Sequence, residues 1–475
     1  MSAPSPLPDP EYLPRASLAE REAHGRSHRV VVPLERHAEW APAPDRADPV
    51  DVLTAQAGER VPELIPIRHG RMAASAFAFY RGGAAIMAAD LACTPTTDLR
   101  SQLCGDAHLC NFGIFETPER HLVFGLNDFD ETLPGPIDWD VKRLAASIEI
   151  AGRDLALSSG DRHKAVVASV RSYREAMLGF AGDRNVDVWY THLPAEDLAS
   201  RLRELGGRRA GDEAERRIRQ ALRRDHMRAF DRLVDGEADG ARFASRPPVL
   251  VPIEDLLDSD ARARYVDVIR GFLHQYRESL PADRRVLVEQ YRFVHMARKV
   301  VGVGSVGTRA WVVLLIGRDD HDPLVLQLKE AQQSVLAPYA GRVPYDNQGR
   351  RVVEGQRLMQ TASDHLLGYY RLQALDGRMH DFYVRQLWDG KASIEVANLT
   401  AKGLRVYGEA CGWTLARGHA RSGDRVAIAA YLGDDPTFED AVATFASAYA
   451  DTNAEDHSRL LAAIEDGRLQ AVSGV

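Results

Sequence analysis

The sequence predicts an α+β protein in which a small β-rich lobe lies, along the chain, between two parts of a larger helical lobe. Apolar residues recur at helical spacing over residues 136–157, and helical patterns return after about residue 395. Between about 290 and 392, β-branched and apolar runs alternate with glycine turns, which is typical of strands. The 475 residues, 45% of them hydrophobic, are enough for two or three units with a core.

The first part of the chain predicts an arm followed by helices. Residues 1–48 are rich in Pro, Arg and acidic residues, which indicates an extended N-terminal arm. Residues 49–289 form the first part of the helical lobe, because an Ala-rich stretch up to Leu91 and a charged run after residue 160 both favour helix. A short strand that enters a polar turn interrupts them at 121–131.

The β-rich lobe is assigned to residues 290–392, and the second part of the helical lobe to 393–475. Within the β-rich lobe the pattern predicts strands, one helix and a hairpin closed by Asp376-Gly377. The expected elements are a strand-turn-strand over 299–317, a strand over 323–331, a helix over 354–370, and paired strands over 369–375 and 381–388.

Composition excludes several classes of partner. The formal net charge of −8 gives no support to binding of nucleic acid or of an anionic membrane. The four cysteines form no Cys-x-x-Cys pair, which favours free thiols. Neither a signal peptide nor an apolar run of membrane-spanning length is evident. We therefore expect a cytoplasmic protein without nucleic-acid or membrane partners, and the oligomeric state stays open.

The glycine-rich turn between the first two expected strands fits Gly-x-Gly-x-x-Gly, a weak signal by itself. A dinucleotide-binding turn would open a helix, whereas the residues after this turn are strand-like. Strand, glycine turn and strand match the flap that covers nucleotide phosphates in kinases, and an ordinary glycine hairpin is the alternative. The nucleotide-binding candidates in the turn are Gly302, Gly304, Ser305 and Gly307.

Lys329 lies on the next expected strand, where an ammonium group could reach nucleotide phosphates. Glu354 begins the following expected helix and could pair with Lys329, which would fix the lysine side chain. The alternative is a surface lysine at a strand end, which is common.

A stretch far earlier in the chain, "GDAHLCNFG", places Asp106 and Asn111 five positions apart, the spacing of a phosphoryl-transfer catalytic loop. Asp106 would accept the proton of an attacking hydroxyl, and His108 could hold the loop or touch a phosphate. Asn111 and Asp128 would bind Mg²⁺ through oxygen atoms, with Asp130 as a further candidate ligand or support. Two Asp/Asn-rich turns stabilised by local hydrogen bonds are the alternative.

Several of these motifs resemble a known family. "GDAHLCNFG", "LNDFDETLPGPIDWDVKRLAAS", "FAFYRGGAAIMAADLA" and "ARKVVGVGSVGT" resemble the bacterial family catalogued as domain of unknown function 2252, over nearly the whole chain. The same motifs are similar to those of the aminoglycoside and choline kinase branch of the kinase-like superfamily, with Cys104 in place of a leading His and Asn127 in place of an Ile. The resemblance implies a two-lobed protein kinase-like fold.

The order of the motifs departs from that superfamily. Its flap and lysine precede the catalytic loop, whereas here Gly302 and Lys329 follow Asp106. The segment "GWTLARGHARSG", residues 412–423, resembles the helix that leads into the loop. The resemblance therefore implies a circular permutation, which preserves spatial contacts.

These observations predict an ATP- and Mg²⁺-dependent phosphotransferase that acts on a hydroxyl of an unidentified small molecule, with Asp106 as the base. The alternatives are a kinase-fold enzyme that transfers AMP to a protein side chain and a nucleotide-binding pseudokinase. Arg68, Arg71 and Arg81 precede the loop and could bind an anionic substrate, or could tie the N-terminal segment to an acidic surface.

Overall fold

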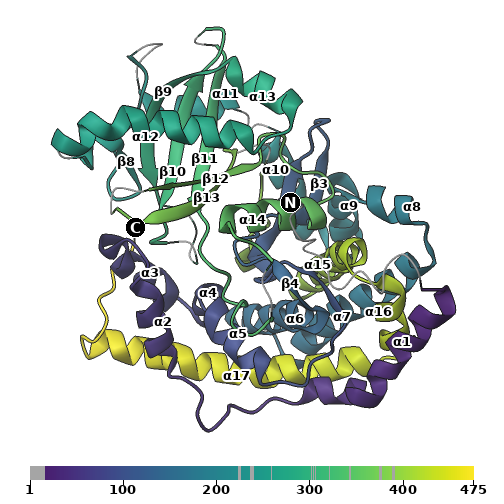
Figure 1. Ribbon diagram of the computed structural model, residues 1–475. Coiled ribbons are helices and arrows are strands. Elements are labelled where there is room, and N and C mark those ends of the chain that lie inside the picture. Colours follow the sequence, from purple (N-terminus) through teal and green to yellow (C-terminus); the bar gives the residue numbers. More distant parts are fainter. Residues whose placement is uncertain are drawn as a thin grey trace.

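A six-stranded sheet forms one end of the molecule and helices build the larger remainder, as the computed structural model in Figure 1 shows. The α+β class expected from the sequence is confirmed, with small sheets and a larger helical part. The structure describes residues 16–222, 226–235, 240–257, 259–300, 302, 304, 306–319, 321–341, 344–373, 377–387 and 391–474. In these ranges no helix is long and apolar enough to cross a membrane.

The large sheet is antiparallel throughout and follows the order β12-β13-β11-β10-β9-β8. The strand expected after the glycine turn is confirmed, as are the third strand and the later hairpin. The strand before the turn was expected to begin at Lys299 and instead ends there. The strands are β8 (Leu250–Pro252), β9 (Arg292–Lys299), β10 (Ala310–Ile316), β11 (Pro323–Glu330), β12 (Gly368–Gln373) and β13 (Met379–Gln386).

Both faces of this sheet are covered, because alternate residues of β10 and β11 point to opposite faces and both sets are largely buried. Helix α12 (Ser259–Glu278) packs on the face that carries Leu326 and Leu328. Helix α11 (His226–Leu233) and the short hairpin of β6 (Val234–Asp235) and β7 (Arg242–Phe243) cover the face that carries Val312 and Val325. The sheet lobe therefore includes segments that precede residue 290, the boundary that the charged, helix-like composition suggested.

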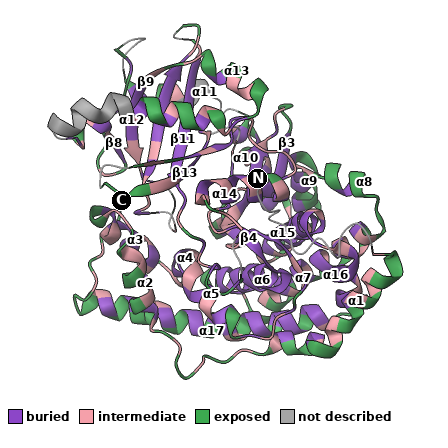
Figure 2. Ribbon diagram, in the orientation of Figure 1, coloured by how far each residue is buried: buried purple, intermediate pink, exposed green. Residues whose placement is uncertain are grey.

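The helical body surrounds α6 (Ile137–Asp154), the helix expected over 136–157. Every residue of α6 from Ile137 to Gly152 is buried, as the central position of this helix in Figure 2 makes visible. Long helices pack around it, and α15 makes its most extensive helix contact with α7. These neighbours are α7 (Ser159–Gly182), α15 (Ala401–Ser422) and α17 (Thr437–Glu465).

The N-terminal segment contains a helix over 18–31 and a short 3-10 helix over 34–38, so the prediction of an extended arm over 1–48 is wrong for these residues, whereas 39–48 form no helix. Helix α1 (Leu18–Val31) begins with a capping box, in which Ser17 and Glu20 satisfy each other's backbone N–H groups. Arg21 ties the helix to Asp424 through an ion pair of 2.6 Å. The Pro-rich composition obscured this capping signal, and residues 1–15 lie outside the described part.

The helix expected over 354–370 begins and ends earlier in the chain. Helix α14 spans Gln348–Met359, because the Asn347 side chain accepts a hydrogen bond from the backbone N–H of Arg350 and caps it. Glu354 is therefore in the middle of the helix rather than at its start. The remaining helices are α2 (Pro49–Ala57), α3 (Ile65–Ala73), α4 (Ala76–Gly82), α5 (Ala84–Ala92), α8 (Asn185–Tyr190), α9 (Ala195–Leu205), α10 (Arg208–Ala221), α13 (Ala282–Glu289) and α16 (Arg425–Leu432).

Two small sheets in the helical body bring the polar turns together. Strand β1 (Arg100–Leu103) pairs with β4 (Leu133–Pro136), and β2 (Phe112–Glu116) pairs with β3 (Leu122–Leu126), which also pairs with β5 (Leu193–Pro194). The chain passes through β1, β2, β3 and β4 in turn, so the turns after β1 and after β3 both connect these two sheets. The backbone N–H of Asn127 donates to the carbonyl of Asn111 (2.9 Å), which confirms that the turns are adjacent.

Candidate functional site

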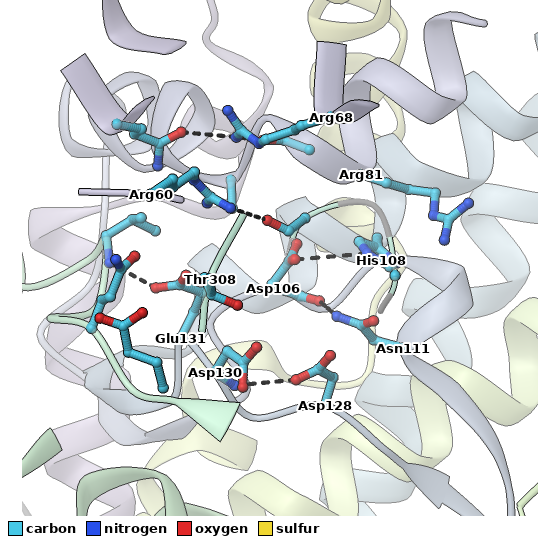
Figure 3. A pocket seen from close by; sticks show the side chains of 18 of the residues that line it. Arg60, Arg68, Arg81, Asp106, His108, Asn111, Asp128, Asp130, Glu131 and Thr308 are labelled. Carbon is cyan, nitrogen blue, oxygen red and sulfur yellow. Dashed lines mark hydrogen bonds and ion pairs between the residues drawn. The ribbon is translucent and has the colours of Figure 1, made fainter. Parts of the chain in front are cut away.

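Residues from three distant parts of the chain line one cleft with a cavity of about 120 Å³ (Figure 3). Helices α3 and α4 and the segment before α3 contribute arginines, and the turns after β1 and β3 contribute carboxylates. The glycine turn between β9 and β10 contributes backbone. The polar side chains and glycines of the lining include Gln56, Arg60, Arg68, Arg81, Asp106, His108, Asn111, Asp128, Asp130, Glu131, Gly302, Gly304 and Thr308.

Asp106 is held by a buried arginine. Arg143, on α6, donates to Asp106 Oδ1 through both Nε (2.9 Å) and Nη2 (2.7 Å). The guanidinium of Arg143 also stacks on the Tyr80 ring, 3.9 Å from its centroid. The second carboxylate oxygen of Asp106 lies 3.7 Å from His108 Nε2. Since both arginine bonds go to Oδ1, Oδ2 is the oxygen left for a ligand.

The backbone of the same loop is fixed by Asp140, which lies in the first turn of α6. Its carboxylate accepts from the N–H groups of Cys104 (2.6 Å) and Gly105 (2.9 Å). Gly105 has φ +84°, and a Cβ there would lie 2.2 Å from the carbonyl oxygen of Glu131. Only glycine fits this position, which accounts for the glycine before Asp106.

Asn111 uses its amide nitrogen within the loop, since Nδ2 donates to the Asp106 carbonyl (2.6 Å). This bond leaves the carbonyl oxygen Oδ1 for a cation, the role expected from the sequence. No group of three or more His, Cys, Asp or Glu side chains is arranged to hold a metal within the described ranges. Asn111 and Asp128 offer oxygen atoms of the kind that a hard cation prefers. Such a cation would take its other ligands from phosphate and water.

A lysine from the sheet stabilises the second turn. Lys329 Nζ donates to Asp130 Oδ2 (2.7 Å), although the two residues are 199 positions apart, and lies 3.7 Å from Asp128 Oδ1. Tyr383 donates its hydroxyl to Asp130 Oδ1 (2.6 Å). Despite burial, Lys329 and the Tyr383 hydroxyl hold the pKa of Asp130 at about 2. The pKa of Asp128 is raised, because it is buried and close to the charge of Asp130.

One expected pairing is wrong, and one expected metal ligand has other partners in this structure. Lys329 does not pair with Glu354, whose carboxylate instead accepts from Arg350 Nε (2.7 Å) one helical turn away. The turn that carries Asp130 reaches the lysine directly, so no partner from α14 is needed. Asp130 has both oxygens engaged by Lys329 and Tyr383, so its bonds fit a residue that positions Lys329 better than a metal ligand.

The glycine turn contributes backbone to the cleft through Gly302 and Gly304. Arg60 Nη1 donates to the carbonyls of Gly304 (2.9 Å) and Val306 (2.5 Å), and Arg71 donates to the carbonyl of Gly302. Gly307 packs beside Arg60 outside the lining, and its φ of +92° favours glycine. The expected nucleotide-binding residue Ser305 lies outside the described residues.

Two further titratable groups of the cleft, His108 and Glu131, have pKa values displaced by burial. Burial lowers the pKa of His108 to about 4, so the imidazole is neutral at pH 7. Burial raises the pKa of Glu131 to about 7. The backbone N–H of Val335 donates to Glu131 Oε2 (2.7 Å).

Sequence reasoning missed Arg60, Glu131 and Arg143. Arg143 follows Asp140 by three positions in an expected helix, and this spacing places both residues on one face beside the loop. That signal was present in the sequence. Arg60 lies in "GERVPEL", where no motif distinguishes it, and only the folded chain brings it to the glycine turn.

The chain belongs to a family described as uncharacterized proteins conserved in bacteria (DUF2252), whose model matches residues 60–463. The match covers the residues that line the cleft except Gln56. Comparison with curated proteins gives no match, and neither does comparison with solved structures.

Proposed function

We propose that this protein is an ATP- and Mg²⁺-dependent phosphotransferase that acts on a hydroxyl group of a small molecule. One observation carries the proposal: Asp106, Asn111 and Asp128 line the same cleft as the glycine turn, although these segments are far apart in the chain. A pocket that combines a fixed carboxylate, oxygen ligands for a hard cation and an exposed glycine backbone has the parts that phosphoryl transfer requires.

Asp106 acts as the base in this proposal. Arg143 fixes its Oδ1, and Oδ2 accepts the proton of the acceptor hydroxyl. The acceptor oxygen forms a bond to the γ-phosphorus, the bond from that phosphorus to the β–γ bridging oxygen breaks, and ADP is released. Because Arg143 keeps the carboxylate in place, the contribution of Asp106 is orientation as much as basicity.

Asn111 Oδ1 and the carboxylate of Asp128 would hold Mg²⁺. When bound, the ion would neutralise negative charge on the phosphate oxygens. Lys329 positions this side of the cleft by pairing with Asp130 and lying close to Asp128. Gly302 and Gly304 allow close approach of phosphate to the backbone, because they carry no side chain.

The same proposal includes a kinase-like arrangement in permuted order. Helix α15 carries the segment that resembles the helix leading into the catalytic loop. The backbone N–H of Gln102, on β1, donates to Ser422 Oγ at the end of α15 (3.1 Å). The C-terminal end of α15 is therefore adjacent to the strand that enters the Asp106 loop, which supports a permuted connection.

One feature restricts where a nucleotide base could lie. Val325, Gln327 and Lys329 alternate onto one face of β11, and α11 with the β6–β7 hairpin covers that face around Val312 and Val325. A nucleotide base can stack on this face only if α11 moves away from it. We therefore expect the amides of residues 226–235 to exchange hydrogen faster when ATP and Mg²⁺ bind, as measured by hydrogen–deuterium exchange.

The proposal is tested with purified protein, ATP, Mg²⁺ and fractionated small-molecule extract. We expect one fraction to cause ATP loss with formation of ADP and a product heavier by one phosphoryl group. Asp128→Asn should abolish this turnover. A product that carries AMP would instead identify the nucleotidyl-transfer alternative. Nucleotide binding without turnover in every fraction would favour a pseudokinase, and either result would contradict phosphoryl transfer.

A further inference from the structure

Arg68 is a buried cation without an anionic partner. Its exposed fraction is 1%, and Nη2 donates to Gln56 Oε1 (3.0 Å) and to the carbonyl of Gly82 (3.0 Å). Nε and Nη1 are buried and have no hydrogen-bond partner among the described residues. A buried charge without an opposite charge raises the free energy of the folded state. The presence of Arg68 therefore indicates an anionic partner that binds from solution.

Two further arginines, both half-buried, also lack an anionic partner among the described residues. Arg60 donates only to backbone carbonyls of the glycine turn, and its buried Nε has no partner in the described ranges. The buried Nε of Arg81 is likewise without one. Where the chain is described, neither residue forms an ion pair. We call these three residues, Arg60, Arg68 and Arg81, the basic wall of the cleft, all of which Figure 3 labels.

Several other buried or half-buried arginines of the same chain have carboxylate partners. Arg143 pairs with Asp106 (2.7 Å), and Arg174 pairs with Glu439 (3.0 Å). Arg46 pairs with both Asp90 (2.7 Å) and Asp456 (2.6 Å). Arg351 and Arg417 are buried without a carboxylate partner, but oxygen atoms accept from every nitrogen of their guanidinium groups. The three residues of the basic wall each keep a buried nitrogen without a partner among the described residues, and all three line one cavity.

We propose that the basic wall binds a phosphate group carried by the acceptor, so that the acceptor is a phosphorylated small alcohol. Guanidinium groups match phosphate oxygens through paired N–H donors, and three of them suit a dianion. Arg81 directly follows Tyr80, the ring on which Arg143 stacks to hold Asp106, so the basic wall borders the proposed base. The assignment to the acceptor rests on the proposed phosphotransfer, whereas anion binding by the wall does not.

The test measures binding by isothermal titration calorimetry, with no turnover required. The probes are inorganic phosphate, glycerol 3-phosphate and glycerol, each without nucleotide, and separately ATP with Mg²⁺. The variants are Arg68→Gln, Arg81→Gln and Asp128→Asn. The control is Arg184→Gln, an arginine far from the cleft lining with a side chain 86% exposed.

We expect saturable binding of both phosphate probes to the unmodified chain, and none of glycerol. Arg68→Gln and Arg81→Gln should each weaken phosphate binding at least tenfold while changing ATP–Mg²⁺ affinity less than threefold. Arg184→Gln should change neither. Asp128→Asn should lose ATP–Mg²⁺ binding and keep phosphate binding, which separates the two ligands.

Three results would overturn the inference. Phosphate binding could be absent, or equal in the arginine variants, which would leave the wall without an anion. Alternatively, the arginine variants could lose ATP–Mg²⁺ binding as strongly as phosphate binding, which would assign the wall to the nucleotide. If ATP fails to bind at all while phosphate binding depends on Arg68 and Arg81, the proposed function fails and the anion site stands without an acceptor.

Discussion

The two walls of the cleft differ in how their charges are compensated. On the acidic wall, formed by Asp106, Asp128, Asp130 and Glu131, Arg143 and Lys329 supply cations at 2.7 Å from carboxylates. On the basic wall, the guanidinium groups of Arg60 and Arg68 donate to neutral carbonyl and amide oxygens. The negative charges of the acidic wall are thus compensated without a ligand, whereas the positive charges of the basic wall require a bound anion. The comparison separates the cations that stabilise the folded cleft, Arg143 and Lys329, from the arginines of the basic wall, which are free to bind a ligand.

The largest expected effect lies on the acidic wall. Asp106→Asn keeps the shape of the side chain but removes the proton acceptor, so turnover should fall about 10²- to 10⁴-fold. The measurement is the rate of ADP formation with the acceptor fraction identified above. Asp187→Asn, at an exposed pair with Arg184, serves as the control. Turnover within twofold of the unmodified chain would exclude Asp106 as the base.

The next effect compares two buried arginines, one that is satisfied and one that is not. Arg351 donates to the carbonyls of Thr132 (2.6 Å), Asp130 (2.8 Å) and Gln332 (2.9 Å). Arg351→Met should therefore lower the free energy of unfolding by about 3–5 kcal/mol, because these carbonyls lose their donor. Arg68→Met should change it by no more than about 1 kcal/mol, since it removes an uncompensated charge.

Urea-induced unfolding of both variants without ligand measures this difference. A loss of several kcal/mol for Arg68→Met would show that the arginine is structural, and would weaken the contrast between the walls. A loss of under 1 kcal/mol for Arg351→Met would show that its hydrogen bonds contribute little.

A smaller effect concerns pH. Glu131 has a pKa raised by burial from 4.5 to about 7, so its charged form is disfavoured in the folded state. The stability that protonated Glu131 contributes is fully present below pH 4.5 and is lost as pH rises through about 7. The free energy of unfolding falls by up to about 3 kcal/mol over this range. Glu131→Gln should therefore be relatively more stable than the unmodified chain at pH 8 than at pH 5. Equal differences at both pH values in urea titrations would contradict the assignment.

The smallest effect is expected at a residue outside both walls. Glu354 pairs with Arg350 across one helical turn, and such pairs contribute about 0.3–0.5 kcal/mol. Glu354→Gln should change ATP–Mg²⁺ affinity less than twofold. A tenfold loss of affinity would instead support the pairing of Glu354 with Lys329 that the sequence predicted.

The comparison of the walls also shows what sequence can provide. The spacing of Asp106 and Asn111 and the position of Asp128 follow from short motifs, and these residues do share the cleft with Gly302 and Gly304. Local patterns carry such information, because each turn is built from neighbouring residues. The fold class and the strand after the glycine turn were predicted for the same reason.

The pairing of residues far apart in the chain could not be predicted from the sequence. Lys329 finds Asp130 rather than Glu354, because the docking of the sheet onto the helical body decides which carboxylate is close. Arg60 reaches the glycine turn across 244 positions of sequence. The capping box of Ser17 and Glu20 was a local signal that composition concealed.

The most direct test of the central claim is a thermal-shift measurement with ATP, with and without Mg²⁺, on the unmodified chain and on Asp128→Asn. If the distant segments form one nucleotide site, ATP should raise the melting temperature of the unmodified chain by several degrees only when Mg²⁺ is present. Asp128→Asn should show no such shift. An equal shift without Mg²⁺, an equal shift in Asp128→Asn, or no shift at all would contradict the account.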